Sequence, residues 1–274
     1  MGVKMWKRIL FSLMSLTVLA GSIWLIQNIE VVLFRQAAWV CVVSLLVGTA
    51  LGTIRTVTKA KYVNKENHGV PVERHTIDSY LEHWGTATGI FVLIFSGIRL
   101  RTGSDVLFSS NLHFLGLTST LLFGSYFLSD FLISKKWNSL LPNFDDVLHG
   151  TIGKYLLRWK WNDKAKYRSS QKSAFLLYLI IGSEIVITGT IKLAAMFLSV
   201  PGEVVSIATS VHDIASILLL LLVLVHILIA ISKHSHRALL FSWFTGKQVR
   251  RQLDGVEAES VSTIDNLLPD ENKT

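Results

Sequence analysis

Six long apolar segments constrain this chain more than any other feature of its sequence. Each is near or above the ~20 residues that a tilted helix needs to cross a bilayer. Backbone polar groups in lipid must be satisfied within the segment, so each segment is expected to be a helix. The sequence therefore predicts an all-α integral membrane helical bundle. The segments run roughly over Ile9–Gln27, Ala37–Ile54, Trp84–Leu100, His113–Ile133, Ala174–Leu198 and Val204–Ser232.

Positive charge alternates between the two ends of these segments. The net charge is +8, which in a soluble protein could indicate nucleic-acid binding. Here most of the 27 lysines and arginines lie at the N-terminus, in the links after the second and fourth segments, and in the C-terminal tail. The opposite links hold only Arg35, Arg99 and Arg101. The positive-inside rule therefore predicts that both termini are cytoplasmic, and no nucleic-acid partner is expected.

The single cysteine, Cys41, lies inside an apolar segment. One cysteine excludes a disulfide framework, a cysteine-ligated iron–sulfur cluster and a covalent Cys-x-x-Cys-His haem site. Any metal centre must therefore be held by histidine or carboxylate.

The first segment allows two interpretations. Basic residues precede it and Ala20-Gly21-Ser22 follow its first part, as in a cleaved signal peptide. The apolar run continues through Ile23-Trp24-Leu25-Ile26, which favours a retained helix. We therefore expect a two-helix membrane hairpin over residues 1–57, a four-helix domain over 58–253, and a disordered acidic tail over 254–274.

Four of the nine histidines lie in or at the ends of apolar segments. His83 begins the third segment, His113 begins the fourth, and His212 and His226 both lie in the sixth. An ionisable side chain is costly in a membrane span, so it usually faces the bundle interior and has a partner. For one such histidine, a hydrogen bond to a neighbouring helix is the ordinary explanation.

The depths of these four histidines predict two pairs. His212 and His226 are 14 residues apart, which on a helix is a rise of ~21 Å and a rotation ~40° short of four full turns. They therefore share a face at two depths, with His113 at the outer level and His83 at the cytoplasmic level. Each pair, His113 with His212 and His83 with His226, can hold one six-coordinate b-type haem iron between two imidazoles.

Five glycines on the same segments fit two interpretations. Close packing of membrane helices favours small residues, and a flat ring also needs nearby backbone. The glycines are Gly85, Gly89, Gly97, Gly116 and Gly124.

Together these residues resemble the four-helix cytochrome b subunit of membrane-bound respiratory dehydrogenases. The best match is the gamma subunit of formate dehydrogenase, and related di-haem subunits serve nickel–iron hydrogenases and thiosulfate reductases. The resemblance covers about residues 72–252. Its elements are His83-Trp84, Leu112-His113, the spacing of His212 and His226, the segment 166–172, which is similar to a Lys-Tyr-x-x-x-Gln-Lys motif, and Ile187-Thr188-Gly189, which is similar to Val-Thr-Gly.

The resemblance implies a four-helix di-haem cytochrome b core in the bacterial cytoplasmic (inner) membrane, with the first two segments as an N-terminal extension. It implies the same ligand pairing and two haem b groups. It also implies a menaquinone or ubiquinone site at the cytoplasmic haem, formed by His226, Arg168 and Ser170. The close relative has asparagine and glycine at the last two positions, which is a departure from the family pattern.

The implied function is electron transfer between a peripheral dehydrogenase and the quinone pool through two b haems. The implied partners are iron–sulfur and catalytic dehydrogenase subunits, quinone and membrane lipid, and the chain is expected to carry no catalytic residue of its own. Two alternatives remain open: a stand-alone electron shuttle of the cytochrome b561 type, and a haem-free membrane transporter or assembly protein.

Overall fold

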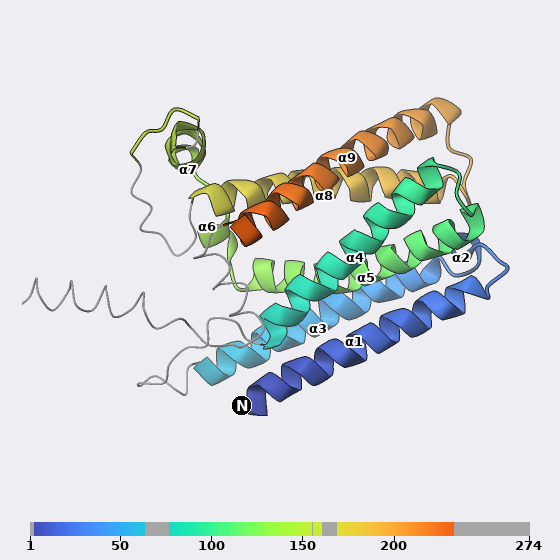
Figure 1. The fold of residues 1–274 in the computed structure, drawn as a ribbon, viewed down its shortest axis with the longest axis horizontal. Coiled ribbons are helices and arrows are strands. Elements are labelled where there is room, and N and C mark those ends of the chain that lie inside the picture. Colours follow the sequence, from blue (N-terminus) through green and yellow to red (C-terminus); the bar gives the residue numbers. More distant parts are fainter. Residues whose placement is uncertain (1–2, 64–76, 155, 161–168, 233–274) are drawn as a thin grey trace, which may run out of the picture.

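The structure is a computed structural model, and it describes residues 3–63, 77–154, 156–160 and 169–232. Within these ranges there are helices and no strands. Six long helices run alternately in opposite directions (Figure 1). They are α1 (Val3–Gln27), α3 (Trp39–Val63), α4 (Ile77–Arg101), α5 (Val106–Ile133), α8 (Ser169–Ala194) and α9 (Gly202–Ser232). The prediction of an all-α helical bundle is confirmed.

Five of these helices are long and apolar enough to cross a membrane, namely α3, α4, α5, α8 and α9. In α1 the apolar part within the described residues is shorter, Leu13–Gln27. The chain is therefore an integral membrane protein. We call the end of the bundle where α1 begins the basic end, and the end with the turns between α4 and α5 and between α8 and α9 the turn end.

The helices extend beyond the apolar segments, so two predicted starting points were wrong. His113 lies well inside α5, because that helix begins at Val106. The Asp105 side chain caps it by accepting a hydrogen bond from the Phe108 backbone N–H at 3.2 Å. Similarly, α4 begins before His83, at Ile77. Polar residues in the first turns of both helices kept these turns out of the predicted apolar segments. A hydropathy pattern marks the part of a helix that lies in lipid and not the whole length of the helix.

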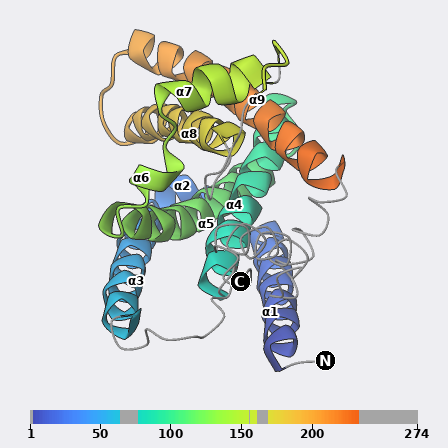
Figure 2. The same ribbon diagram turned by 90° about the vertical axis from the view of Figure 1, so that its left-hand side faces the viewer.

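Helix α5 is the centre of one layer, with α4 and α3 packed along it (Figures 1 and 2). Small residues allow these helices to approach closely. A Cβ on Gly89 or on Gly116 would lie 3.1 Å from the other glycine's carbonyl oxygen. On α3, a Cβ on Gly48 or Gly52 would collide with the backbone carbonyl of Leu122 or of Tyr126. This layer is therefore held by close backbone contacts.

The polar residue Asn111 of α5 fixes the link before α3. Its amide donates to the carbonyl of Val31 at 2.9 Å and accepts from the backbone N–H of Leu33 at 2.9 Å. Leu33 is the first residue of the short helix α2 (Leu33–Gln36). Asn111 is fully buried, and its two bonds account for a buried amide in an apolar helix.

Helices α8 and α9 form a second layer beside α4 and α5 (Figure 2). Near the basic end, Phe175 of α8 contacts Phe127 and Phe131 of α5, with ring centroids 6.0 and 5.5 Å away. At the turn end, Arg101 of α4 pairs with Asp213 of α9 at 2.8 Å. The two layers are thus joined at both ends.

A short helical segment caps the start of α8 at the basic end (Figure 1). It comprises α6 (Trp137–Leu140), α7 (Phe144–Val147) and the π-helix η1 (Leu148–Gly153). The expected boundary at residue 57 falls inside α3, which continues to Val63. The expected acidic tail, 254–274, lies outside the described residues.

Candidate functional site

Two of the predicted histidines come together between the layers. The rings of His83 on α4 and His226 on α9 lie with their centroids 6.3 Å apart and their planes inclined by 47°. Both side chains are exposed. They lie toward the basic end, because α4 begins there and α9 ends there (Figure 1).

The spacing of these two rings fits one metal ion between them. Metal–imidazole bonds are about 2 Å long, so two opposed ligating nitrogens are about 4 Å apart and their ring centroids about 6 Å apart. The observed separation of 6.3 Å agrees with that value. Two neutral imidazoles at this separation have the chemistry needed to hold one haem iron.

Two aromatic residues surround this pair. Trp84 packs edge-on against His83 with ring centroids 5.5 Å apart. Tyr178 of α8 packs edge-on against His226 at 6.3 Å, and its hydroxyl donates to the Leu222 carbonyl at 3.2 Å. Sequence reasoning missed Tyr178. Its position about two turns into α8, on the face toward α9, follows only from the packing of the hairpin.

The other two histidines have matching hydrogen bonds. His113 Nδ1 lies 2.9 Å from the hydroxyl of Ser96 on α4. His212 Nδ1 lies 3.0 Å from the hydroxyl of Thr188 on α8. In each case a hydroxyl on the neighbouring helix of the same layer contacts the same ring nitrogen.

The other contacts of these two hydroxyls bear on the position of the imidazole proton. The Ser96 hydroxyl donates to the carbonyl of Val92 at 2.7 Å, and the Thr188 hydroxyl donates to that of Glu184 at 2.6 Å. All of these contacts are satisfied when each hydroxyl accepts from the histidine and the histidine carries its proton on Nδ1. The Nε2 lone pair is then available for a metal. Histidine ligands in metal sites are oriented in the same way.

Glycines lie beside both of these rings. A Cβ on Gly189 would be 3.4 Å from His212 Cε1, and one on Gly97 would be 3.9 Å from His113 Cε1. Among the described residues, the rings of His113 and His212 make no direct contact with each other. Of the five glycines considered from the sequence, only Gly97 lies beside a histidine.

Three of the other four glycines serve helix packing. Gly85 faces Phe123, Gly89 faces Thr120, and Gly116 faces Leu93. A Cβ on Gly124 would meet nothing within 4 Å. For these positions the simpler interpretation from the sequence, close packing of helices, is the correct one.

The residues predicted to contact quinone are only partly described. Arg168 lies outside the described residues. Ser170 is the second residue of α8 and lies at the basic end, as do His83 and His226. The neighbouring Ser169 is buried and donates its hydroxyl proton to Asp146 at 2.7 Å.

Asp146 anchors the beginning of α8. Its carboxylate also accepts from Lys172 at 2.9 Å and from the Asn143 backbone N–H at 3.1 Å. Burial raises the pKa of this carboxyl, but the hydrogen bonds from Lys172 and Ser169 lower it by a larger amount. The net result is a pKa below the ordinary value of 3.8. The segment that carries Ser170 is therefore fixed by a buried ion pair.

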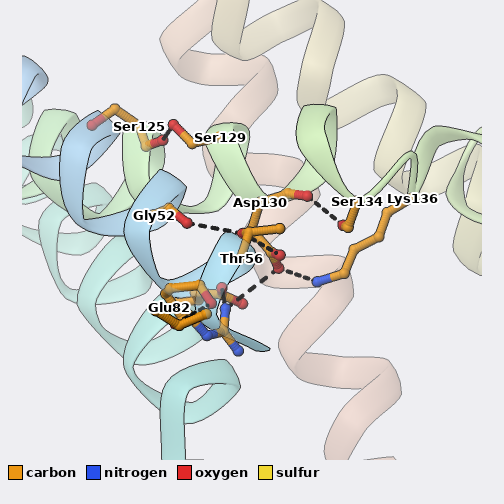
Figure 3. Close-up of polar contacts among 10 residues, drawn as sticks. Gly52, Thr56, Glu82, Ser125, Ser129, Asp130, Ser134 and Lys136 are labelled. Atoms are coloured by element: carbon orange, nitrogen blue, oxygen red, sulfur yellow. Dashed lines mark hydrogen bonds and ion pairs between the residues drawn. The ribbon is translucent and has the colours of Figure 1, made fainter. Parts of the chain in front are cut away.

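Sequence reasoning also missed a buried charged network at the basic end (Figure 3). Arg55 of α3 pairs with Glu82 of α4 at 2.5 Å and with Asp130 of α5 at 3.4 Å. Asp130 also pairs with Lys136 and accepts from the Thr56 hydroxyl at 2.9 Å. Glu82 is next to His83 in the sequence, and Asp130 lies inside an apolar segment. Charged residues are rare in membrane spans, and this signal could have identified both.

No group of three or more histidine, cysteine, aspartate or glutamate side chains in the described ranges could hold a metal ion. A haem iron needs only two protein ligands, one on each side of the ring. A histidine pair such as His83 and His226 is therefore the relevant unit.

Comparison with known families gives one match. The family model described as prokaryotic cytochrome b561 matches residues 74–246. The match contains all four histidines and leaves α1 and α3 outside it. Searches of curated proteins and of solved structures gave no match. The predicted resemblance to a cytochrome b family is confirmed.

Proposed function

Because the chain belongs to the prokaryotic cytochrome b561 family, we propose that it is the membrane subunit of a respiratory oxidoreductase complex. Family membership makes it a bacterial membrane cytochrome b that binds haem b and transfers electrons. The finer proposal is that it connects a peripheral dehydrogenase, of the formate dehydrogenase type, with the quinone pool.

In this proposal two haem b groups are held by four histidines, His83 with His226 and His113 with His212. The observation that carries it is the 6.3 Å separation of the His83 and His226 rings, which come from different layers. The hydroxyls of Ser96 and Thr188 support the second pair, because they leave Nε2 of His113 and His212 free to ligate. When bound, each haem iron accepts and returns one electron.

The protein's part in electron transfer is positioning. Four imidazoles on α4, α5 and α9 hold two redox centres at two depths of the membrane. Since both sides of each iron would be ligated, no open position remains for oxygen or substrate. The basic end is proposed to be cytoplasmic, with both termini there, because the basic links lie at that end.

A quinone is proposed to react at the basic end, near His226, Arg168 and Ser170. The start of α8 is a suitable support, because Asp146 holds it through Lys172 and Ser169. Menaquinone or ubiquinone would exchange protons with the same side of the membrane. The dehydrogenase and its iron–sulfur subunit would then supply electrons at the turn end.

The test uses the purified full-length protein under anaerobic conditions. Adding menadiol, a soluble menaquinol analogue, should reduce haem b and produce its sharp alpha band. Arg168→Ala and Ser170→Ala should slow this reduction, whereas dithionite should still reduce every haem. If menadiol and a short-chain ubiquinol both leave the haem oxidised, the quinone link is wrong.

The stand-alone shuttle is the second candidate, and the family name favours it as directly as the complex. Mild purification from native membranes separates the two. A co-purifying iron–sulfur or molybdenum- or nickel-containing subunit supports the complex. A chain that is purified alone and still exchanges electrons with quinol supports the shuttle.

A further inference from the structure

The buried network of Arg55, Glu82, Asp130 and Lys136 joins the N-terminal extension to the matched family region. Arg55 lies on α3, outside residues 74–246. Its two carboxylate partners, on α4 and α5, lie inside that range. Glu82 is 7% exposed and Asp130 is 4% exposed, so both pairs are largely shielded from solvent.

Docking α3 onto α5 does not need these charges. Gly48 and Gly52 already bring the two backbones into close contact. Burying ions costs free energy, and a buried ion pair is often no more stabilising than apolar residues of the same size. Charged residues in a membrane span are therefore usually functional. The network calls for a role other than packing.

The position of Glu82 indicates what that role is. Glu82 immediately precedes His83 on α4, and its carboxylate is held by Arg55 at 2.5 Å. The Arg55 guanidinium also lies over the Tyr126 ring, 5.6 Å from its centroid. Arg55 is thus fixed from α4 and α5 together, and it fixes the rotation and height of the helical turn that presents His83.

We infer that Arg55, on the N-terminal extension, is a positioning residue for the haem held by His83 and His226, and that the network sets the potential of that haem. This inference rests on the proposed function. Its described members are two acidic and two basic side chains. Removing one member leaves an uncompensated charge close to His83, in a medium of low dielectric constant where charges interact strongly.

The signs of the expected shifts follow from the charge that each variant removes. Arg55→Gln leaves excess negative charge, which stabilises the oxidised iron and lowers the midpoint potential of the haem at His83. Glu82→Gln leaves excess positive charge, which stabilises the reduced iron and raises that potential. A role in folding alone would not shift the midpoint potential in opposite directions in the two variants.

The experiment is a redox titration of the full-length protein, followed at the alpha band and by electron paramagnetic resonance of the oxidised haems. The variants His226→Ala and His212→Ala assign each component to one histidine pair. The haem at His113 and His212 serves as an internal control. Arg35→Gln is the matched control, because Arg35 is an exposed arginine on the same extension.

Two results together would support the inference. The midpoint potential should shift in opposite directions in Arg55→Gln and Glu82→Gln, only for the haem at His83 and His226, and it should return to the wild-type value in Arg55→Lys. Unchanged potential and spectrum of this haem in Arg55→Gln would overturn it. Equal loss of both haems in Arg55→Gln and in Arg55→Lys would also overturn it, because Arg55 would then act on folding alone. Wild-type protein without haem would instead contradict the proposed function.

Discussion

Nδ1 of His212 on α9 lies 3.0 Å from the hydroxyl of Thr188 on α8, and that hydroxyl also donates to the carbonyl of Glu184. The bond ties the two helices of the hairpin at one histidine and leaves Nε2 of that histidine free to ligate. Ser96 and His113 repeat the arrangement on α4 and α5. The proposed ligands at this depth are therefore each oriented by a neighbouring helix.

Replacing Thr188 by valine should weaken haem binding at this pair about 10- to 100-fold, because the orientation of the ligand is lost. Haem titration of the apoprotein, with binding followed in the Soret region, measures the effect. Thr188→Ser should restore most of the affinity. Thr190→Val is the matched control, since the Thr190 hydroxyl bonds only to the Val186 carbonyl. Equal affinities in Thr188→Val and wild type would contradict the assignment.

Bulk at Gly189 should displace the same imidazole. A Cβ added there would be in van der Waals contact with His212 Cε1 at 3.4 Å. Gly189→Leu should therefore lower haem content by about one equivalent, as measured by the pyridine haemochrome of purified protein. Gly182→Leu is the control, because a Cβ at Gly182 meets nothing within 4 Å. Full haem content in Gly189→Leu would show that the ring has room to move.

Close contact of α3 with α5 should be sensitive to a single methyl group. Gly48→Ala should destabilise the protein by about 1–3 kcal/mol, because the new Cβ meets the Leu122 carbonyl and cannot be accommodated without a backbone shift. Gly124→Ala should be neutral or stabilising, since nothing lies near it and alanine favours helix. Thermal unfolding in detergent, followed by circular dichroism, compares the two. Equal melting temperatures would contradict the packing.

The ion pair of Asp146 should make stability depend on pH in the acidic range. The folded-state pKa of this carboxyl lies below its ordinary value of 3.8, so its contribution is fully present above that value. The contribution is lost as pH falls through the folded pKa. Wild type should therefore be more stable than Asp146→Asn at neutral pH, and the difference should close in strong acid.

Unfolding in detergent at several pH values measures that difference. Asp145→Asn is the matched control, because Asp145 is an exposed carboxylate that bonds His149 at 3.1 Å. A difference between wild type and Asp146→Asn that stays constant down to strong acid would contradict the ionic role of Asp146.

Much of the fold could be predicted because membrane helices follow simple rules of length and charge. The sequence also predicted that His83 and His226 share one depth, and in the structure their rings lie 6.3 Å apart. The alternating direction of the helices and the rise along each helix were sufficient for that expectation. The starts of α4 and α5 were misjudged, because polar residues such as Asn111 continue the helices beyond the apolar runs.

The partners of the histidines could not be predicted in the same way. Ser96 and Thr188 contact His113 and His212 only because each helix pair has a particular rotation about its axes. The pairing of Arg55 with Glu82 likewise depends on how α3 sits against α4 and α5. A single sequence fixes depth along a helix, whereas rotation is decided by packing between helices.

The most direct test of the account is the number of haem b groups per chain in the purified full-length protein, measured by pyridine haemochrome against protein concentration. We predict two per chain in wild type. His212→Ala and His226→Ala should each retain about one, and the double variant none. One haem in wild type, or two retained in His226→Ala, would contradict the assignment of two bis-histidine sites.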